Sequence, residues 1–153
     1  MLPKKTVLVI DDEVDVRSGV ARMLLKHGYG VQAFECAEPA IKHLREGGPA
    51  DLIVLDIMMP GMTGLGFLRE LRGPMHSRTP VILLTARSSS ADIGDGYNKG
   101  AEFYITKPFE PKTLINAVDY LIGELPPEKQ SLLEVELLTS ENVYYGLRTI
   151  TYR

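Results

Sequence analysis

The most constraining feature of the sequence is a short apolar run that ends at a single carboxylate. Leu52–Leu55 reads Leu-Ile-Val-Leu, with no alternation of polar and apolar residues, and Asp56 follows it directly, before a turn-rich stretch with Pro60 and Gly61. A short, branched and wholly apolar run of this kind predicts a strand that is buried on both faces of a sheet. Asp56 therefore stands at the exit of a central strand, where open α/β sheets bind ligands.

Similar apolar runs recur along the chain, and helical stretches separate them. The other predicted strands are Thr6–Ile10, Val31–Phe34, Val81–Leu84 and Phe103–Thr106. Between them, apolar residues recur at helical spacing, which predicts helices over residues 16–27, 37–46, 65–71 and 111–122. Regular alternation of strands and helices with short connections predicts an α/β fold with a doubly wound parallel sheet of five strands.

Five helices are expected in all, and the fourth of them should follow Ser88–Ser90. The sequence of this fourth helix is a weak helix former. Gly94 and Gly96 fall inside it, and each glycine costs about 1 kcal/mol relative to alanine. One interpretation is that these glycines ease remodelling of the helix and make this face of the domain mobile; slow amide exchange across Ala91–Lys99 would refute it. The other interpretation is that they permit close packing or end the helix early.

The chain is long enough for one well-filled core followed by a short extension. Its 153 residues are 44% hydrophobic, and Pro126-Pro127 interrupts the helical pattern after Gly123. We therefore expect a domain over residues 4–123 and an extension over residues 124–153. The extension has a helix-competent part, Glu128–Thr139, and a strand-like part, Asn142–Tyr152. A dimerisation arm, a cap over the domain, the start of an output domain and a disordered tail all stay open, as does pairing with a second subunit's sheet edge.

Composition excludes several classes of protein. The formal net charge of -3 provides no general attraction for nucleic acid, so we expect no direct nucleic-acid binding by this chain. Cys36 is the single cysteine, which rules out an intrachain disulfide and fits a reducing compartment. No apolar run approaches the roughly 18 residues of a membrane helix, and the first residues lack the apolar core of a signal peptide. These features predict a soluble, cytoplasmic protein.

Polar residues collect where the predicted strands end. Asp11 and Asp12 follow the first strand, Asp56 the third, Thr85 the fourth and Lys107 the fifth. The carboxyl ends of parallel strands meet at one edge of a sheet, so these side chains are expected to converge. Three carboxylates repel one another unless a cation lies among them, and oxygen ligands are those that Mg²⁺ prefers. The sequence therefore predicts a divalent metal site.

This arrangement suits phosphoryl chemistry at Asp56. With a metal held by the three carboxylates, Asp56 can attack a phosphoryl group and become an aspartyl phosphate. Thr85 can donate its hydroxyl to a phosphoryl oxygen, and Lys107 can supply a cation. Each of these residues alone has an ordinary structural explanation, such as a cap, a turn or a surface charge. The case depends on all of them occurring at successive strand ends, together with Lys107-Pro108, a bond that can be cis.

These motifs resemble those of a known family. They are Val7-Leu8-Val9-Ile10-Asp11-Asp12-Glu13, Leu55-Asp56-Ile57-Met58-Met59-Pro60-Gly61-Met62-Thr63-Gly64, Thr85-Ala86-Arg87 and Tyr104-Ile105-Thr106-Lys107-Pro108-Phe109. Over Lys4–Gly123 the chain resembles a receiver domain of the two-component response-regulator family. The resemblance implies a flavodoxin-like sheet with strand order 2-1-3-4-5. It also implies phosphorelay signal transduction, in which a sensor histidine kinase or a histidine phosphotransfer protein donates the phosphoryl group.

The resemblance assigns a role to each candidate residue. Asp56 is the phosphoacceptor. Asp12, Asp56 and the backbone carbonyl of Met58 are direct ligands of Mg²⁺ or Mn²⁺, and Asp11 acts through water. Thr85 and Lys107 bind the phosphoryl group, and Thr85 and Tyr104 are the switch residues. Phosphorylation is then expected to shift the packing of the fourth helix, fifth strand and fifth helix, and so to control a partner, an output domain or a homodimer.

Two other functions compete with this interpretation. An aspartate-nucleophile phosphatase also forms an aspartyl phosphate, but it places an acid/base aspartate two residues after the nucleophile, where this chain has Met58. We therefore expect no enzyme acting on external substrates, only catalysis of the chain's own phosphorylation and dephosphorylation. A phosphorylation-independent interaction module is the second alternative, and the intact set of polar residues argues against it.

Overall fold

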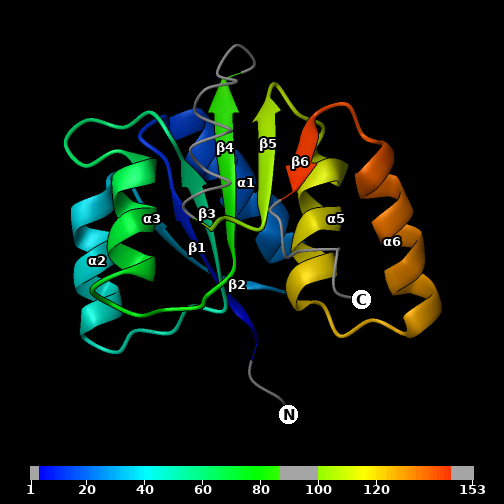
Figure 1. Ribbon diagram of the computed structural model, residues 1–153, viewed down its shortest axis with the longest axis horizontal. Helices are drawn as coiled ribbons and strands as arrows, with labels where there is room; N and C mark the ends of the chain where they lie inside the picture. The colour runs from blue at the N-terminus through cyan, green and yellow to red at the C-terminus, as the bar shows by residue number, and fades with distance from the viewer. Residues whose placement is uncertain (1–3, 87–99, 146–153) are drawn as a thin grey trace.

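A central β-sheet with helices on both faces forms the protein (Figure 1). The structure is a computed structural model that describes residues 4–86 and 100–145. The strands are β1 (Thr6–Ile10), β2 (Gly30–Phe34), β3 (Leu52–Asp56), β4 (Val81–Ala86), β5 (Phe103–Lys107) and β6 (Val143–Tyr145). The helices are α1 (Val14–Lys26), α2 (Ala37–Arg45), α3 (Gly64–Arg72), α5 (Pro111–Ile122) and α6 (Pro127–Thr139). The helix expected after Ser88–Ser90, with Gly94 and Gly96, lies outside the described residues.

The sheet confirms the expected topology and adds one strand to it. Its strand order is β2-β1-β3-β4-β5-β6, and the first five strands are parallel. β6 pairs antiparallel with β5, with Val143 opposite Ile105 and Tyr145 opposite Phe103. Val143–Tyr145 of the extension thus pair with the edge of their own sheet, and the rest of its strand-like part, residues 146–152, lies outside the described residues. The five predicted parallel strands are all present.

Both faces of the sheet are apolar because helices cover both. Along β1, Val7 and Val9 belong to the core beneath α1 and α5, whereas Leu8 and Ile10 belong to the core beneath α2 and α3. Every residue of β3 is buried. This explains why the strand sequences show no polar alternation, and it leaves the strand ends as the positions where polar side chains collect.

The extension packs against α5. The Asn116 side-chain amide donates to Glu136 at 2.8 Å, and the Gln130 side chain donates to the Tyr120 carbonyl at 2.9 Å. Leu137 is fully buried in the same core as α5, so α6 and β6 continue the layers of the domain. Among the helices of the described ranges, none has the length and apolar character of a membrane span.

Candidate functional site

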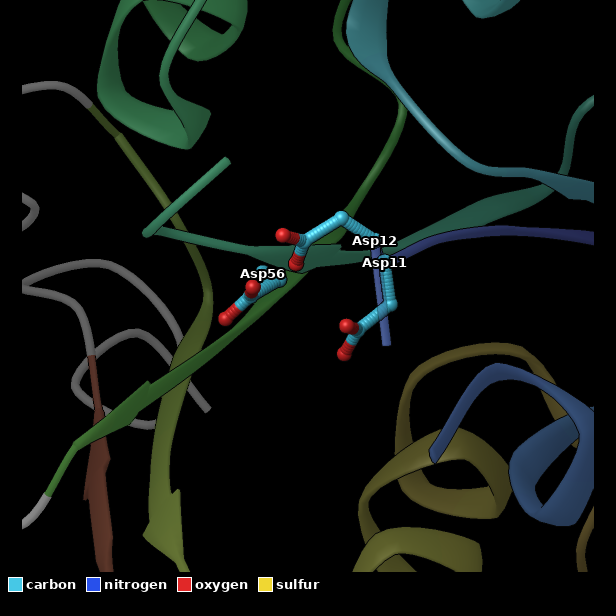
Figure 2. A group of neighbouring side chains, drawn as sticks. All are labelled: Asp11, Asp12 and Asp56. Atoms are coloured by element: carbon cyan, nitrogen blue, oxygen red, sulfur yellow. The ribbon is translucent and has the colours of Figure 1, made fainter. Parts of the chain in front are cut away.

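Three carboxylates converge at the carboxyl edge of the sheet, as predicted (Figure 2). β1 and β3 are parallel neighbours with Ile10 opposite Leu55, so the next residues, Asp11 and Asp56, leave the sheet side by side. One carboxylate oxygen from each of Asp11, Asp12 and Asp56 lies within 4.8 Å of the others. Asp11 and Asp56 are buried and Asp12 is exposed, which leaves the cluster open to solvent on one side.

The turn after β1 is held in place by hydrogen bonds around Asp11. The amide of Glu13 donates to Asp11 Oδ1 at 2.9 Å, and the Asp11 amide donates to the Phe34 carbonyl at 3.1 Å. Arg17 Nη1 donates to the Asp11 carbonyl at 2.7 Å. Arg17 was not predicted as a site residue, although a cation in the first turn of a helix, where acidic residues are favoured, is a usable signal.

The exit of β3 depends on a glycine at the start of the next helix. The Gly64 amide donates to the Ile57 carbonyl at 2.9 Å. A Cβ at position 64 would collide with the Asp56 carbonyl oxygen and the Ile57 Cα, so only glycine lets α3 begin this close to the phosphoacceptor candidate. Met58, whose carbonyl is the remaining expected metal ligand, lies on the same loop and is 65% exposed. Its role as a ligand stays a prediction.

Lys107 reaches the acidic cluster from the end of β5. Its ammonium Nζ lies 3.2 Å from Asp56 Oδ1, 3.3 Å from Asp11 Oδ2 and 3.7 Å from Glu13 Oε1. The Lys107-Pro108 peptide bond is cis. Burial opposes the charge on the ammonium, but Asp56 and Asp11 outweigh it and raise the pKa of Lys107. Lys107 is therefore a cation that bridges the two buried carboxylates.

Thr85 and Tyr104 lie on the neighbouring strands. β4 pairs with β3 so that Leu84 is opposite Asp56, which places Thr85 one residue beyond that level at the same sheet edge. Thr85 is buried, and its hydroxyl lies 3.4 Å from the Ala86 carbonyl, at the outer limit of a hydrogen bond. Tyr104 is fully buried and belongs to the same core cluster as residues of α2 and α3. The ring of this expected switch residue thus lies inside the protein in this structure.

The electrostatic environment of Asp56 opposes its charge. Burial, followed by the charge of Asp11, raises the pKa of Asp56 from 3.8 to about 6, against the lowering effect of Lys107. The folded protein therefore holds a proton on Asp56 more tightly than the unfolded chain does. The stabilisation from this proton is complete below about pH 3.8 and is lost as pH rises through about 6.

Removing the charge of Asp56 is expected to change the pH dependence of stability. In EDTA, the free energy of unfolding of Asp56→Asn relative to that of the unaltered protein should rise by about 2 kcal/mol between pH 4 and pH 7.5, because Asp56 of the unfolded chain is already partly ionised at pH 4. Urea unfolding at several pH values measures this difference, in which groups common to both proteins cancel. A difference that stays constant across this range would contradict the raised pKa.

The donor set of the cluster fits a hard divalent cation. The available ligand atoms are carboxylate and carbonyl oxygens, which suit Mg²⁺ or Mn²⁺, and no sulfur or imidazole belongs to the described cluster. A bound cation would offset both the burial and the repulsion by Asp11 that raise the pKa of Asp56. Asp11, Asp12 and Asp56 are the residues that would hold it, with water completing the coordination.

A groove with apolar walls begins beside Lys107. It has a volume of about 600 Å³, and it lies between α1 and the segment that joins β5 to α5. Val16, Val20 and Met23 line one side, and Pro108 and Phe109 line the other. The groove therefore offers a surface for an apolar partner next to the acidic cluster.

Comparisons with known proteins agree with this geometry. A family model described as "Response regulator receiver domain" matches residues 7–119. Protein PetR of Rhodobacter capsulatus is 38% identical over 146 residues, which cover 95% of this chain and 56% of PetR. The phosphate regulon transcriptional regulatory protein PhoB of Escherichia coli is 36% identical over 124 residues, which cover 80% of this chain and 54% of PhoB. The chain thus spans little more than half of these relatives.

Solved structures share the fold over most of the chain. The crystal structure of FixJ-N has a TM-score of 0.72 and 30% identity, covering 82% of this chain and 98% of that one. The chemotaxis protein CheY4 of Vibrio cholerae has a TM-score of 0.72 and 29% identity, covering 78% of this chain and 100% of that one.

Proposed function

This chain belongs to the response regulator receiver domain family of two-component systems, and we propose that Asp56 is the residue that accepts its phosphoryl group. The observation that carries this proposal is the convergence of three carboxylates with one lysine. Asp56 is buried at a strand exit, its neighbours Asp11 and Asp12 complete an oxygen-only cluster, and Lys107 Nζ lies 3.2 Å from Asp56 Oδ1. That arrangement offers a nucleophile, a cation site and a fixed positive charge within one small volume.

We propose that Asp11, Asp12, Asp56 and the Met58 carbonyl hold Mg²⁺ or Mn²⁺. When bound, such a cation neutralises charge on the oxygens of an incoming phosphoryl group. An oxygen of the Asp56 carboxylate then forms a bond to phosphorus, while the bond from phosphorus to the donor breaks and its electron pair leaves with the donor. Lys107 and the Thr85 hydroxyl bind phosphoryl oxygens that would otherwise repel Asp56.

The phosphoryl donor is, by this proposal, a sensor histidine kinase or a histidine phosphotransfer protein. The groove beside Lys107 supports such a partner because its apolar walls can hold a helix while a reactive imidazole reaches Asp56. The output passes through the predicted fourth helix, β5 and α5, with Thr85 and Tyr104 as the switch residues. Because the net charge is -3, we infer that the phosphorylated chain acts on a protein partner or output domain and does not itself bind DNA.

The chain lacks the general acid that an aspartate-nucleophile phosphatase needs. The residue two positions after Asp56 is Met58, whose thioether carries no proton to donate to a leaving group, and its side chain is largely exposed. We therefore infer that the chain does not turn over external phosphate esters.

Intact mass tests the proposal directly. Incubation of the chain with Mg²⁺ and acetyl phosphate is expected to add a single phosphoryl group, with acetate as the leaving group, and peptide mapping should place it in residues 52–59. The same incubation in EDTA should leave the mass unchanged. No adduct on a folded protein that binds Mg²⁺ would contradict the proposal and favour a phosphorylation-independent interaction module.

A further inference from the structure

Asn142 joins the C-terminal extension to the turn that carries Lys107. Its carbonyl accepts a hydrogen bond from the Thr106 amide at 2.9 Å, and the Thr106 hydroxyl lies 3.5 Å from the same oxygen. Its side-chain amide donates to the Pro108 carbonyl at 3.2 Å. One residue of the extension thus holds the backbone on both sides of Lys107.

Asn142 is itself anchored to the body of the protein. Val143, the next residue, is buried in the core and pairs with Ile105 of β5. The Asn142 amide lies 3.4 Å from the Ser140 hydroxyl, within the short turn that joins α6 to β6. Leu137 and side-chain hydrogen bonds hold α6 against α5. Because Asn142 lies between α6 and β6, its position is fixed at both ends.

We propose that Asn142 is a positioning residue for Lys107. This inference rests on the proposed function, in which the Lys107 ammonium binds the phosphoryl group at Asp56. A lysine has a long, flexible side chain, so where its ammonium can reach depends on how well its backbone is held. The two bonds from Asn142 fix that backbone beside the cis Lys107-Pro108 bond, and the Lys107 ammonium then lies between Asp56 and Asp11. By this proposal, the extension helps to position Lys107 at the phosphorylation site.

The matched test compares two asparagines that both link the domain to its extension. Asn142→Ala removes the bond to Pro108, whereas Asn116→Ala removes the bond between α5 and Glu136 of α6. With saturating Mg²⁺ and acetyl phosphate, Asn142→Ala is expected to slow phosphorylation about fivefold, because a small displacement of a positioned group is costly. Asn116→Ala is expected to stay within about twofold of the unaltered protein, although it also removes a contact of the extension.

A double-mutant cycle separates positioning from general weakening of the fold. In a Lys107→Ala background, Asn142→Ala should cause no further loss of rate, because the group that it positions is already gone. Asn142→Asp provides a second variant of nearly unchanged size that lacks the amide donor. Equal rates for Asn142→Ala and Asn116→Ala, or a full further loss in the Lys107→Ala background, would overturn the inference. An unaltered protein that gains no phosphoryl group would instead overturn the proposed function.

Discussion

The Asp56→Asn variant is expected to gain no phosphoryl group under conditions in which the unaltered protein gains one. An amide has neither the charge nor the nucleophilicity of a carboxylate, so the rate should fall at least about 1000-fold. Neither neighbouring carboxylate is expected to substitute for it. Asp11 is buried, with one oxygen near the Lys107 ammonium and the other accepting the Glu13 amide, and Asp12 is exposed at the rim of the cluster. Intact mass after incubation with Mg²⁺ and acetyl phosphate measures the effect.

Asp51→Asn is the matched control for this variant. Asp51 immediately precedes β3, at the opposite end of the strand from Asp56, and its side chain accepts a hydrogen bond from the Thr6 amide at 2.7 Å. The substitution removes one carboxylate from the same segment without touching the cluster, so phosphorylation should proceed at the unaltered rate. An adduct on Asp56→Asn that maps to Asp11 or Asp12 would show that the nucleophile had been wrongly assigned.

The convergence of the site could be predicted because it depends on strand direction alone. Once the apolar runs before Asp11, Asp56, Thr85 and Lys107 were identified as parallel strands, their ends had to meet at one edge. The structure brings Asp11, Asp12 and Asp56 within 4.8 Å and places Lys107 against two of them. The sequence does not give interatomic distances of this kind, but it does indicate which residues lie at the strand ends.

The partners of the extension could not be predicted in the same way. The strand β6 has three residues, too few for a periodic signal, and its pairing with β5 joins segments that are about forty residues apart. The residue type of Asn142 does not indicate its contact with the Pro108 carbonyl either, so the role of Asn142 appears only in the structure. The sequence did locate a helix and a strand-like segment after Pro126-Pro127, and the structure shows what they touch.

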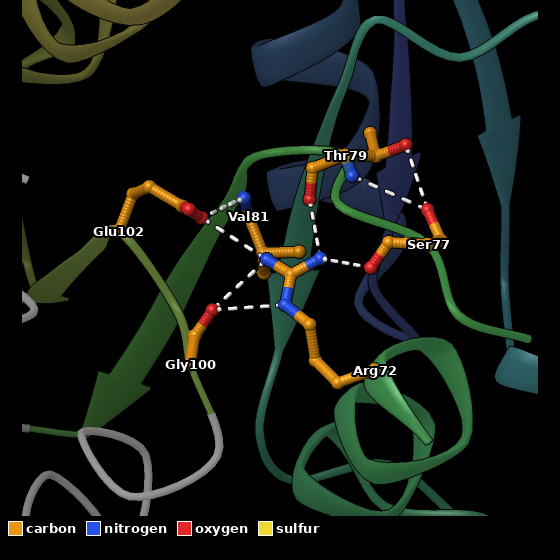
Figure 3. Close-up of polar contacts among 6 residues, drawn as sticks. All are labelled: Arg72, Ser77, Thr79, Val81, Gly100 and Glu102. Carbon is orange, nitrogen blue, oxygen red and sulfur yellow. Dashed lines mark hydrogen bonds and ion pairs between the residues drawn. The ribbon is translucent and has the colours of Figure 1, made fainter. Parts of the chain in front are cut away.

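Arg72 is the clearest example of such a hidden contact, and its removal is expected to have the largest effect on stability (Figure 3). Its guanidinium donates to the carbonyls of Gly100, Ser77 and Thr79 at distances from 2.7 to 3.1 Å, and to the Glu102 carboxylate at 3.1 Å. It thereby ties the end of α3 to the segments that lead into β4 and β5. Arg72→Met keeps much of the apolar stem and removes all of these hydrogen bonds, although the Val81 amide still donates to Glu102 at 2.8 Å. The substitution should cost about 3 kcal/mol of the free energy of unfolding.

Arg45→Met is the control for this prediction. It tests whether the loss of stability in Arg72→Met comes from the hydrogen-bond network around Arg72 or would follow the loss of any ion pair. Arg45 contacts Glu70 at 2.6 Å, but its side chain is 60% exposed, whereas that of Arg72 is 21% exposed. An exposed pair is screened by solvent, so Arg45→Met should cost less than about 1 kcal/mol. Urea unfolding of the two variants in the same buffer gives the comparison, and the melting temperature of Arg72→Met should fall by about 10 °C. Equal losses for the two variants would mean that the backbone carbonyls around Arg72 find water in its place, and that α3 is not held to β4 and β5 by this side chain.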